Sequence, residues 1–434
     1  MGEPTRIKIT NEYWDEYLEC MPREQLNQQR ALMMHKHLRY TYQNSTYYKN
    51  LFHRIGLNPE TVVRMEDFQS RVPLTRQEEI IANQVDSPPF GDFLALNLKH
   101  VTRIYSSPGP LMMPFSKEDM DSYINTTANG LYICGARRGD IADITYAYQW
   151  DLAGTMLDEG FRRLGCAVVP GGPGMSETHA LVMKHLGVTI LRVFPSFAFK
   201  LADTARRMGI DPAGDLKVRL LIIGGEIIDE EEKARLAKVF DAEVREMYGW
   251  AETGFVAAQC REGGGMHCFS HNIVEVIDPD SGEPVGPDKR GEVVVTDVSR
   301  RAMPLIRYRT GDITAGLTYE PCPCGRTSPR LQGIVDHTGD TLHIRGVHVT
   351  PRMVEDVVRQ QKSIGRYQII AEKEGFGERF VLRVELEWQE DRNAIAKKLK
   401  EQIRIATRLR VVVEFAPRGS IREGGPIIID KRHE

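Results

Sequence analysis

Residues Met247–Gly254 read Met-Tyr-Gly-Trp-Ala-Glu-Thr-Gly and follow a run, Glu243–Met247, that alternates polar and apolar side chains. Such alternation predicts a half-buried strand, and Gly249 marks the point where it breaks into a glycine-bearing loop. A carboxylate, two hydroxyls and an indole therefore gather at one strand end. Ligands of open α/β sheets bind outside the carboxyl ends of strands, so we expect a binding site here, with ordinary turn chemistry as the alternative.

Two further segments carry similar signals. Upstream, the apolar run Leu220–Ile223 ends in Gly224-Gly225-Glu226, which predicts a buried strand that opens into a glycine loop. Downstream, Met303–Asp312 reads Met-Pro-Leu-Ile-Arg-Tyr-Arg-Thr-Gly-Asp. At these three segments the sequence resembles the phenylacetate–coenzyme A ligase branch of the adenylate-forming superfamily, which also holds acyl-CoA synthetases, adenylation domains and luciferases. The resemblance covers nearly the whole chain, from Leu38–Phe52 to Pro417–Arg432.

The composition is that of a soluble globular protein, with 41% hydrophobic and 27% charged residues. A length of 434 residues exceeds one compact core, so we expect two or more domains. A net formal charge of -3 without a basic block argues against nucleic acid as the main partner, and no apolar run approaches the roughly 20 residues of a membrane span. The polar start, Met1–Glu12, lacks a signal-peptide core, so we expect a cytoplasmic protein whose seven cysteines are thiols or metal ligands.

Alternating strand-like and helical runs predict an α/β fold between Val101 and Met208, with a parallel sheet and helices on both faces. From Asn272 the pattern is β-rich, which indicates a small antiparallel barrel or sheet at about 270–333. The resemblance implies a large N-terminal adenylate-binding domain of stacked, mostly parallel sheets over 1–335 and a mobile α+β C-terminal lid over 336–434. Thr75 is expected to cap a helix that starts beside it.

Two loops carry residues with the spacing of metal ligands. Cys260 and His267 form Cys-x6-His in a glycine-rich loop, and Cys322 and Cys324 stand in Cys-Pro-Cys-Gly. Three thiolates and an imidazole suit a tetrahedral structural zinc, and some relatives are similar in both loops. The alternatives are four unrelated loop residues, or Cys268 as a competing ligand.

The resemblance implies an adenylate site with magnesium. In it, Asp312 would accept hydrogen bonds from a ribose diol and Tyr248 would flank the adenine. Catalysis would involve Glu252, which would carry the Mg²⁺ that bridges phosphates, and Thr253, which would reach the α-phosphate. The nucleotide-contacting positions carried over from the family are Gly225, Glu226, Tyr248, Gly249, Asp312 and Arg345.

Aromatic side chains at two predicted strand ends suggest a wall for a flat acyl group. They are Tyr148, Trp150, Phe194 and Phe197. Core packing is the alternative explanation for them.

Some positions depart from the family pattern. Relatives have a phosphate loop like Ser-Ser-Gly-Thr-Thr-Gly-Lys-Pro, whereas Ser106–Met113 reads Ser-Ser-Pro-Gly-Pro-Leu-Met-Met, in which two prolines remove two N–H donors. His337 and Gly339 align with the arginine and the hinge aspartate of the lid. Gly425 aligns with the catalytic lysine, and Lys431, further along, belongs to the tail.

Two functions remain. The first is a ligase that activates an aryl or arylacetic acid, a small-molecule carboxylic acid, with ATP as acyl-AMP. Transfer to coenzyme A and assembly as a homodimer are open expectations of this hypothesis. The second is a repurposed homologue that has lost ATP-driven activation and binds an adenylate or acyl ligand, or catalyses another reaction. The retained Glu252 and Asp312 favour the first, whereas the shortened loop and the missing lysine favour the second.

Overall fold

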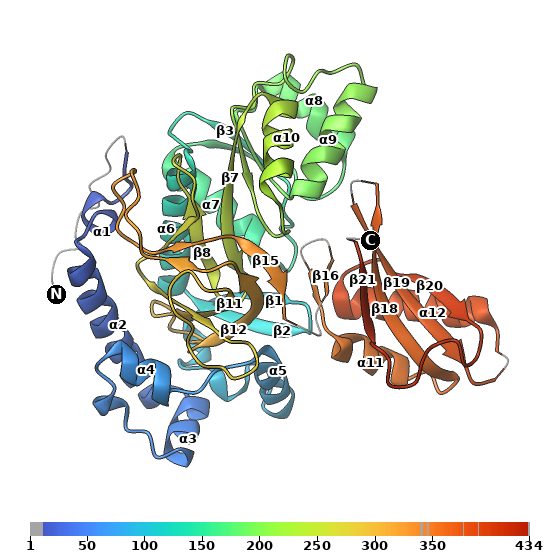
Figure 1. The fold of residues 1–434 in the computed structure, drawn as a ribbon, viewed down its shortest axis with the longest axis horizontal. Coiled ribbons are helices and arrows are strands. Elements are labelled where there is room, and N and C mark those ends of the chain that lie inside the picture. The colour runs from blue at the N-terminus through green and yellow to red at the C-terminus, as the bar shows by residue number, and fades with distance from the viewer. Residues whose placement is uncertain (1–11, 339–341, 345–346, 376, 389, 433–434) are drawn as a thin grey trace. The chain divides into compact units, whose positions relative to one another are not determined.

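The computed structural model describes residues 12–338, 342–344, 347–375, 377–388 and 390–432 (Figure 1). Helices and strands alternate along most of the chain, so the expected α/β class is confirmed. Contacts divide the chain into two compact units, one made of residues 1–107 and 111–336 and another that contains residues 337–434. Each unit has hydrophobic core residues of its own.

A nine-stranded mixed sheet forms the centre of the first unit. Its parallel half runs in the order β4 (Ala167–Val169), β3 (Ile141–Ile144), β5 (Ile190–Val193), β6 (Leu220–Ile223) and β7 (Glu243–Trp250). Its antiparallel half continues through β8 (Gly254–Gln259), β9 (Met266–Cys268), β14 (Arg330–Leu331) and β13 (Leu317–Thr318). The sheet is parallel over one half only, because the chain returns from β7 to β8 through a tight turn instead of a crossover helix.

Helices cover both faces of the parallel half. They are α6 (Lys117–Cys134), α7 (Leu152–Leu164), α8 (Ser176–Leu186), α9 (Pro195–Arg207) and α10 (Glu230–Phe240). Ile222 packs in a core with α6 and α7, whereas its neighbour Leu221 packs with α8, α9 and α10, which lie together in Figure 1. Successive strand residues point to opposite faces, so a strand buried on both faces is apolar throughout, as Leu220–Ile223 is.

Further helices precede the sheet. They are α1 (Glu16–Glu19), α2 (Arg23–Asn44), α3 (Thr46–Arg54), α4 (Met65–Arg71) and α5 (Gln77–Asp86). In α3, the Ser45 side chain accepts a hydrogen bond from the Tyr48 N–H, which satisfies one of the free donors at the helix start. Within the described part of the chain, no helix combines the length and apolar character needed to cross a membrane.

A four-stranded sheet and a hairpin complete the first unit. The sheet has the order β10 (Asn272–Ile277), β11 (Gly291–Asp297), β12 (Tyr308–Thr314) and β15 (Ile334–His337). It lies in the segment that the sequence predicts to be β-rich, while β13 and β14 of the same segment join the large sheet. The hairpin consists of β1 (Val101–Ser107) and β2 (Leu111–Ser116), with Pro108-Gly109-Pro110 at its turn.

The prediction that Thr75 caps a helix is wrong. α5 begins at Gln77 after Arg76, and no side-chain cap precedes it. The Thr75 hydroxyl instead donates to the Ile306 carbonyl at 2.7 Å, and its N–H donates to a neighbouring main-chain carbonyl. Long-range pairing with the segment before β12 therefore replaces the local cap, and it places α5 beside that strand.

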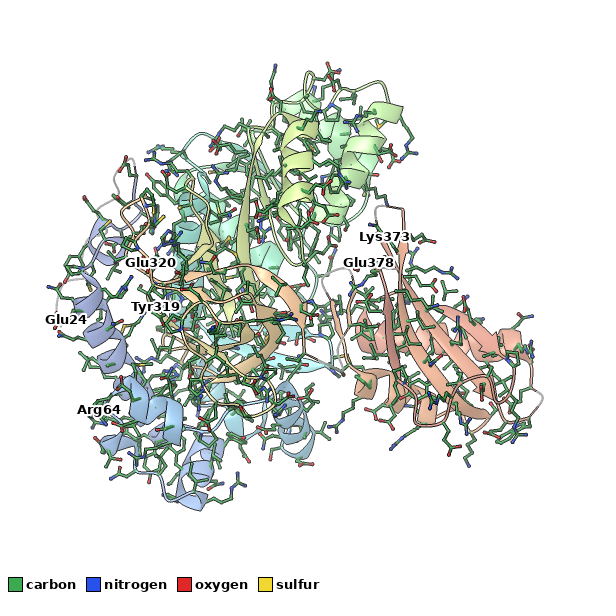
Figure 2. All side chains as sticks on the ribbon, in the orientation of Figure 1. Glu24, Arg64, Tyr319, Glu320, Lys373 and Glu378 are labelled. Carbon is green, nitrogen blue, oxygen red and sulfur yellow. The ribbon has the colours of Figure 1, made fainter. Side chains whose placement is uncertain are left out.

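The second unit is an α+β layer. Its sheet has the order β20 (Val412–Ala416), β19 (Gly377–Leu386), β18 (Ile364–Glu374) and β21 (Ile428–Lys431). The other elements are the hairpin β16 (Leu342–Ile344) and β17 (Val347–Val349) with helices α11 (Pro351–Arg359) and α12 (Arg392–Thr407). Figure 2 shows Lys373 and Glu378 at the turn of the β18–β19 hairpin, where they are register partners. The sequence does not reveal β21, which pairs in parallel with β18.

A buried histidine joins β3 to α8. His179 Nδ1 lies 2.6 Å from Asp143 Oδ2, and its Nε2 lies 2.9 Å from the Gly172 carbonyl oxygen. Burial acts to lower the pKa of His179, but the hydrogen bond and charge of Asp143 outweigh it, so the pKa is raised. His179 therefore ties the loop after β4 to the sheet, and Asp143 favours its imidazolium form.

Replacing His179 by Gln should destabilise the protein by roughly 1–3 kcal/mol at pH 6, the range for hydrogen bonds to charged groups. A raised pKa means that this contribution is fully present below pH 6.5, the ordinary value, and is lost as pH rises through the folded-state pKa. Urea unfolding at pH 6 and pH 9 measures the difference. His185→Gln, an exposed residue of the same helix, is the control, and a pH-independent effect of His179→Gln would contradict the assignment.

Candidate active site

The end of β7 meets β12 through three polar side chains. The Tyr248 hydroxyl donates to Asp312 Oδ2 at 2.8 Å, and the Trp250 indole N–H donates to the same oxygen at 2.6 Å. Asp312 is only 2% exposed. Burial first and the neighbouring carboxylate second raise the pKa of Tyr248 well above its ordinary value, so the tyrosine stays a donor. The structure thus brings together Tyr248 and Asp312, which the sequence places in one nucleotide site.

Trp250 supplies the indole that the sequence places at this strand end, but the sequence reasoning gave it no contact with Asp312. It stands two positions after Tyr248 on β7, and residues two apart on a strand point to the same face. This periodicity is the signal that could have found it.

Glu252 lies in the turn between β7 and β8 and is buried. Its Oε1 accepts hydrogen bonds from the Ser107 hydroxyl at 2.7 Å and from the Gln77 side-chain amide at 3.1 Å. The adjacent Thr253 is also buried, and its hydroxyl donates to the Gly254 carbonyl at 3.4 Å. A carboxylate and a hydroxyl side by side supply the oxygen ligands that Mg²⁺ prefers. Ser107 and Gln77 come from distant segments, and no local pattern marks them.

The glycine loop after β6 packs tightly. Gly225 has φ +82°, and a Cβ there would lie 2.4 Å from the Phe194 ring, so only glycine fits. The Glu226 carboxylate accepts from the Ser196 N–H at 2.9 Å and from the Ser196 hydroxyl at 2.7 Å, which caps α9. Glu226 therefore has a structural partner, and its role beside adenine stays a prediction. A Cβ at Gly249 would lie 2.4 Å from the Gly254 carbonyl oxygen, so glycine there permits the tight turn from β7 to β8.

The four predicted aromatic wall residues differ in burial. Phe194 stacks on Tyr146 with ring centroids 4.2 Å apart, and Phe197 meets His179 edge-on at 5.8 Å. The Tyr148 hydroxyl donates to an Asp158 carboxylate oxygen at 3.2 Å. Trp150 is 74% exposed, with φ +63°, while the other three are half-buried. Phe194 and Tyr148 thus lie at the carboxyl ends of β5 and β3, and Trp150 stands apart from them in burial.

Cys260, His267, Cys322 and Cys324 form one cluster. Their possible ligand atoms all lie within 4.8 Å of one another, with Cys260 Sγ 3.7 Å from Cys322 Sγ and Cys324 Sγ 3.3 Å from His267 Nε2. β14 pairs with β9, and this pairing returns the second cysteine loop to the strand that carries His267. Hydrogen bonds from Cys260 and then His267 lower the pKa of Cys324.

Cys268 is outside this cluster. It follows His267 on β9, so its side chain points to the other face of the sheet. Burial raises the pKa of the Cys268 thiol to about 12, which keeps it a neutral core group. The competing set of ligands that includes Cys268 is therefore not the one that the fold assembles.

Comparison with known proteins decides the family. The models of the AMP-binding enzyme and of the AMP-binding enzyme C-terminal domain match residues 150–299 and 346–432. The phenylacetate-coenzyme A ligase of Thermus thermophilus is 32% identical over 378 residues, which cover 85% of this chain and 83% of that protein. The chain belongs to the phenylacetate–coenzyme A ligase family of AMP-binding enzymes.

Two further likenesses agree with this family. The phenylacetate-coenzyme A ligase of Aromatoleum evansii is 28% identical over 92% of this chain and 93% of that protein. The crystal structure of a 2-hydroxyisobutyryl-CoA ligase in complex with 2-HIB-AMP and CoA has the same fold, with a TM-score of 0.93, 24% identity and coverage of 100% and 95%. The chain is therefore an adenylate-forming ligase by family, and ATP or AMP and CoA are the cofactors of that family.

The hairpin at the family's phosphate loop is short. Ser106 and Ser107 are buried, and the Ser107 hydroxyl donates to Glu252. The Ser106 N–H donates to the Trp150 carbonyl at 2.9 Å, and the Gln84 side-chain amide bonds both the N–H and the carbonyl of Met112. In an AMP-binding enzyme these groups would face phosphates, but here they are tied to the protein itself.

The lid positions are only partly described. Gly339 and Arg345 lie outside the described residues, so their predicted roles stay open. His337 ends β15. Gly425 stands in a turn closed by its N–H bond to the Arg422 carbonyl at 3.1 Å. Lys431 is in β21, where it pairs in register with Glu372 of β18.

Proposed function

We propose that the chain activates an aryl or arylacetic acid with ATP as acyl-AMP and passes the acyl group to coenzyme A. The observation that supports this proposal is the buried polar set at the end of β7 and on β12, where Tyr248, Glu252 and Asp312 are the residues that the family resemblance assigns to nucleotide and magnesium. Both phenylacetate-coenzyme A ligases compared above support it. The substrate class, the site roles and the lid movement are inferences from this family membership.

The chemistry would depend on positioning and charge. The substrate carboxylate would attack the α-phosphorus while pyrophosphate leaves, and groups that hold both partners in line lower the barrier. Glu252, with Ser107 beside it, fits the oxygen ligands of Mg²⁺, which would neutralise phosphate charge. Asp312 would hold the ribose by exchanging its indole donor for a ribose hydroxyl. Thr253 would meet the α-phosphate after rotation of its hydroxyl from Gly254.

The direct experiment supplies ATP, Mg²⁺, coenzyme A and a panel of arylacetic, benzoic and short aliphatic acids. AMP and an acyl-CoA thioester should appear in equal amounts with an aryl or arylacetic acid. Thioester formed only from aliphatic acids would contradict the proposed aryl or arylacetic substrate class. The absence of AMP with every acid would reject ATP-driven activation.

A second function is favoured by the closed hairpin and by Gly425. If phosphates have no cradle at Ser106–Met113, the chain could bind an adenylate or acyl ligand without turning over ATP. In this interpretation the donors that a triphosphate would need are engaged in the protein or replaced by proline, whereas Tyr248, Trp250 and Asp312 remain together for a ribose. This alternative predicts ligand binding without pyrophosphate exchange.

We also propose that the Cys260, His267, Cys322 and Cys324 cluster holds a structural zinc. Three sulfurs and one imidazole nitrogen are the donor set of closed tetrahedral zinc sites, and they leave no open position for catalysis. The zinc would fix the loop after β8 to the loop before β14.

Asp312→Ala should weaken AMP binding by roughly 1–3 kcal/mol, because hydrogen bonds to a charged group are lost. Wild-type protein should bind AMP at least as well as ATP, since the ribose site is intact and the phosphate hairpin is short. Titration calorimetry with both nucleotides measures these affinities. Asp280→Ala, in an exposed turn, is the control. Unchanged AMP affinity in folded Asp312→Ala would rule out the ribose role.

Purified protein should hold about one zinc per chain, and Cys322→Ser with Cys324→Ser should lose both the metal and thermal stability, because metal binding is coupled to folding. Elemental analysis and thermal melts make the measurement. Cys268→Ala is the matched control and should retain zinc. Protein prepared without chelators that contains no zinc, or zinc that depends on Cys268, would contradict the proposed ligands.

Gly425→Lys separates the two functions. Charge placed at reacting oxygens is worth about 10²–10³ in rate, so the variant should raise ATP–pyrophosphate exchange if the chain is an impaired adenylating enzyme. An unchanged rate would favour the second function. A Cβ at Gly425 lies 3.1 Å from the Arg422 carbonyl oxygen, so a small local shift accommodates it.

If the unmodified protein catalyses ATP–pyrophosphate exchange, a cation other than the missing lysine must act at the reacting oxygens. Arg418 is paired with Glu387 at 2.6 Å, which leaves Arg422 as the better candidate beside Gly425. Robust exchange that survives both Arg418→Ala and Arg422→Ala would show that the lysine position is misaligned.

A further inference from the structure

Arg192 is a fully buried arginine near the carboxyl end of β5. It is 1% exposed and stands opposite Ile144 of β3 and Ile222 of β6 in the register of the sheet. Its neighbours Leu191 and Val193 point into the core beneath α8 and α9, so the Arg192 side chain leaves the strand on the other face. The positively charged side chain of Arg192 is therefore surrounded by apolar side chains.

The Arg192 guanidinium contacts one carbonyl and two aromatic rings, and it also interacts with the Tyr146 hydroxyl. Nη1 donates to the Ile222 carbonyl at 3.0 Å, and the guanidinium carbon lies 4.5 Å from the Tyr146 ring centroid and 5.8 Å from that of Phe255. Nε is buried without a hydrogen-bond partner. Among the described residues, no carboxylate lies within ion-pair distance of it.

Two other buried arginines of this unit are neutralised. Arg307 pairs with Glu275 at 3.1 Å, and Arg326 pairs with Glu19 at 2.6 Å. Arg300 also lacks an ion pair among the described residues, but it donates to the main-chain oxygen of Glu252 and so acts on the turn of the candidate site. A buried cation without a counter-charge is costly, and cation–π contacts offset only part of that cost. Arg192 therefore has an unmet need for an anion.

The surroundings of Arg192 are those of the acyl region. Its guanidinium nitrogens would lie 3.3 and 3.5 Å from a Cβ at Gly224, the first residue after β6. Tyr146, which it faces, stacks on Phe194 and donates its hydroxyl to the Gly224 carbonyl at 2.7 Å. Burial raises the pKa of Tyr146 to about 12, and the charge of Arg192 acts in the opposite direction. The Arg192 guanidinium thus lies next to the stacked rings of Tyr146 and Phe194 at the strand ends.

We infer that Arg192 selects an acid whose acyl part carries a second carboxylate. This inference rests on the proposed function and names its substrate class as an aromatic dicarboxylate, one carboxylate being activated and the other neutralising Arg192. A flat ring between the two charges matches the Tyr146 and Phe194 stack. Arginine suits the task because its planar fork binds a carboxylate with two parallel hydrogen bonds.

The test compares phenylacetate with its 2-, 3- and 4-carboxy derivatives in wild-type protein and in Arg192→Met and Arg192→Lys. In the wild type, kcat/KM for the best carboxyphenylacetate should exceed that for phenylacetate by at least about tenfold, since a site built for a polar group rejects analogues that lack it. Arg192→Met should lower this ratio by about 10–100-fold, and Arg192→Lys should lower it less. Arg245→Met, a half-buried arginine on β7 that pairs with Glu243, is the control.

Several results would overturn the inference. They are a wild-type preference for phenylacetate over all three derivatives, and an equal effect of Arg192→Met on every acid. Replacing a buried charge by an apolar side chain of similar length is often neutral for stability, so Arg192→Met should melt near the wild type. If it does not fold, Arg192→Lys decides, because the loss of the fork must lower the ratio while an unchanged ratio rejects the role.

Failure of the proposed function is distinguishable from failure of this inference. If no acid supports AMP formation, the ligase proposal fails, and calorimetric titration of the four acids in the presence of AMP still decides the role of Arg192. Tighter binding of a carboxyphenylacetate to wild type than to the folded variant upholds the charge contact. Equal binding to both proteins rejects it.

Discussion

The hydrogen bond from Tyr248 to Asp312 joins the two sheets of the large unit. Tyr248 stands on the nine-stranded sheet and Asp312 on the four-stranded sheet, and both groups are buried. A carboxylate buried without a donor would be strongly destabilising, so the approach of one sheet to the other depends on this contact and on the Trp250 indole. The same contact suits a ligand site. A polar group of a ligand can replace one of the two donors to Asp312 at little cost in free energy, because the carboxylate stays hydrogen-bonded.

The architecture follows largely from periodicity. Leu220–Ile223 was predicted as a buried strand because it is apolar without alternation, and the alternation of strands and helices predicted up to Met208 is observed from β3 to α9. The cysteine and histidine spacing also predicted these four side chains as one ligand set but left Cys268 as a competitor, and strand alternation in the structure separates Cys268 from them. The strand and helix features are local, whereas the cysteine cluster also needs the pairing of β14 with β9.

Other features depend on contacts between distant segments. Thr75 has the local sequence of a helix cap, but a carbonyl from Ile306 competes for its hydroxyl. Ser107 and Gln77 bond to Glu252 across 145 and 175 positions of sequence, and no pattern in either segment shows this. The burial of Arg192 is likewise invisible in a sequence where arginine normally indicates a surface. Such contacts are decided by tertiary packing, which overrides local preference.

The β1–β2 ribbon has a consequence for how molecules of this protein meet one another. A two-stranded ribbon has two open edges, and open edges recruit strands from other chains. Here the Trp150 carbonyl occupies the Ser106 N–H, the Gln84 amide occupies both groups of Met112, and Pro114 in β2 has no N–H to offer. Trp150 has a left-handed backbone conformation, with a positive φ, and its carbonyl points toward β1. These groups thereby protect the protein against edge-to-edge aggregation.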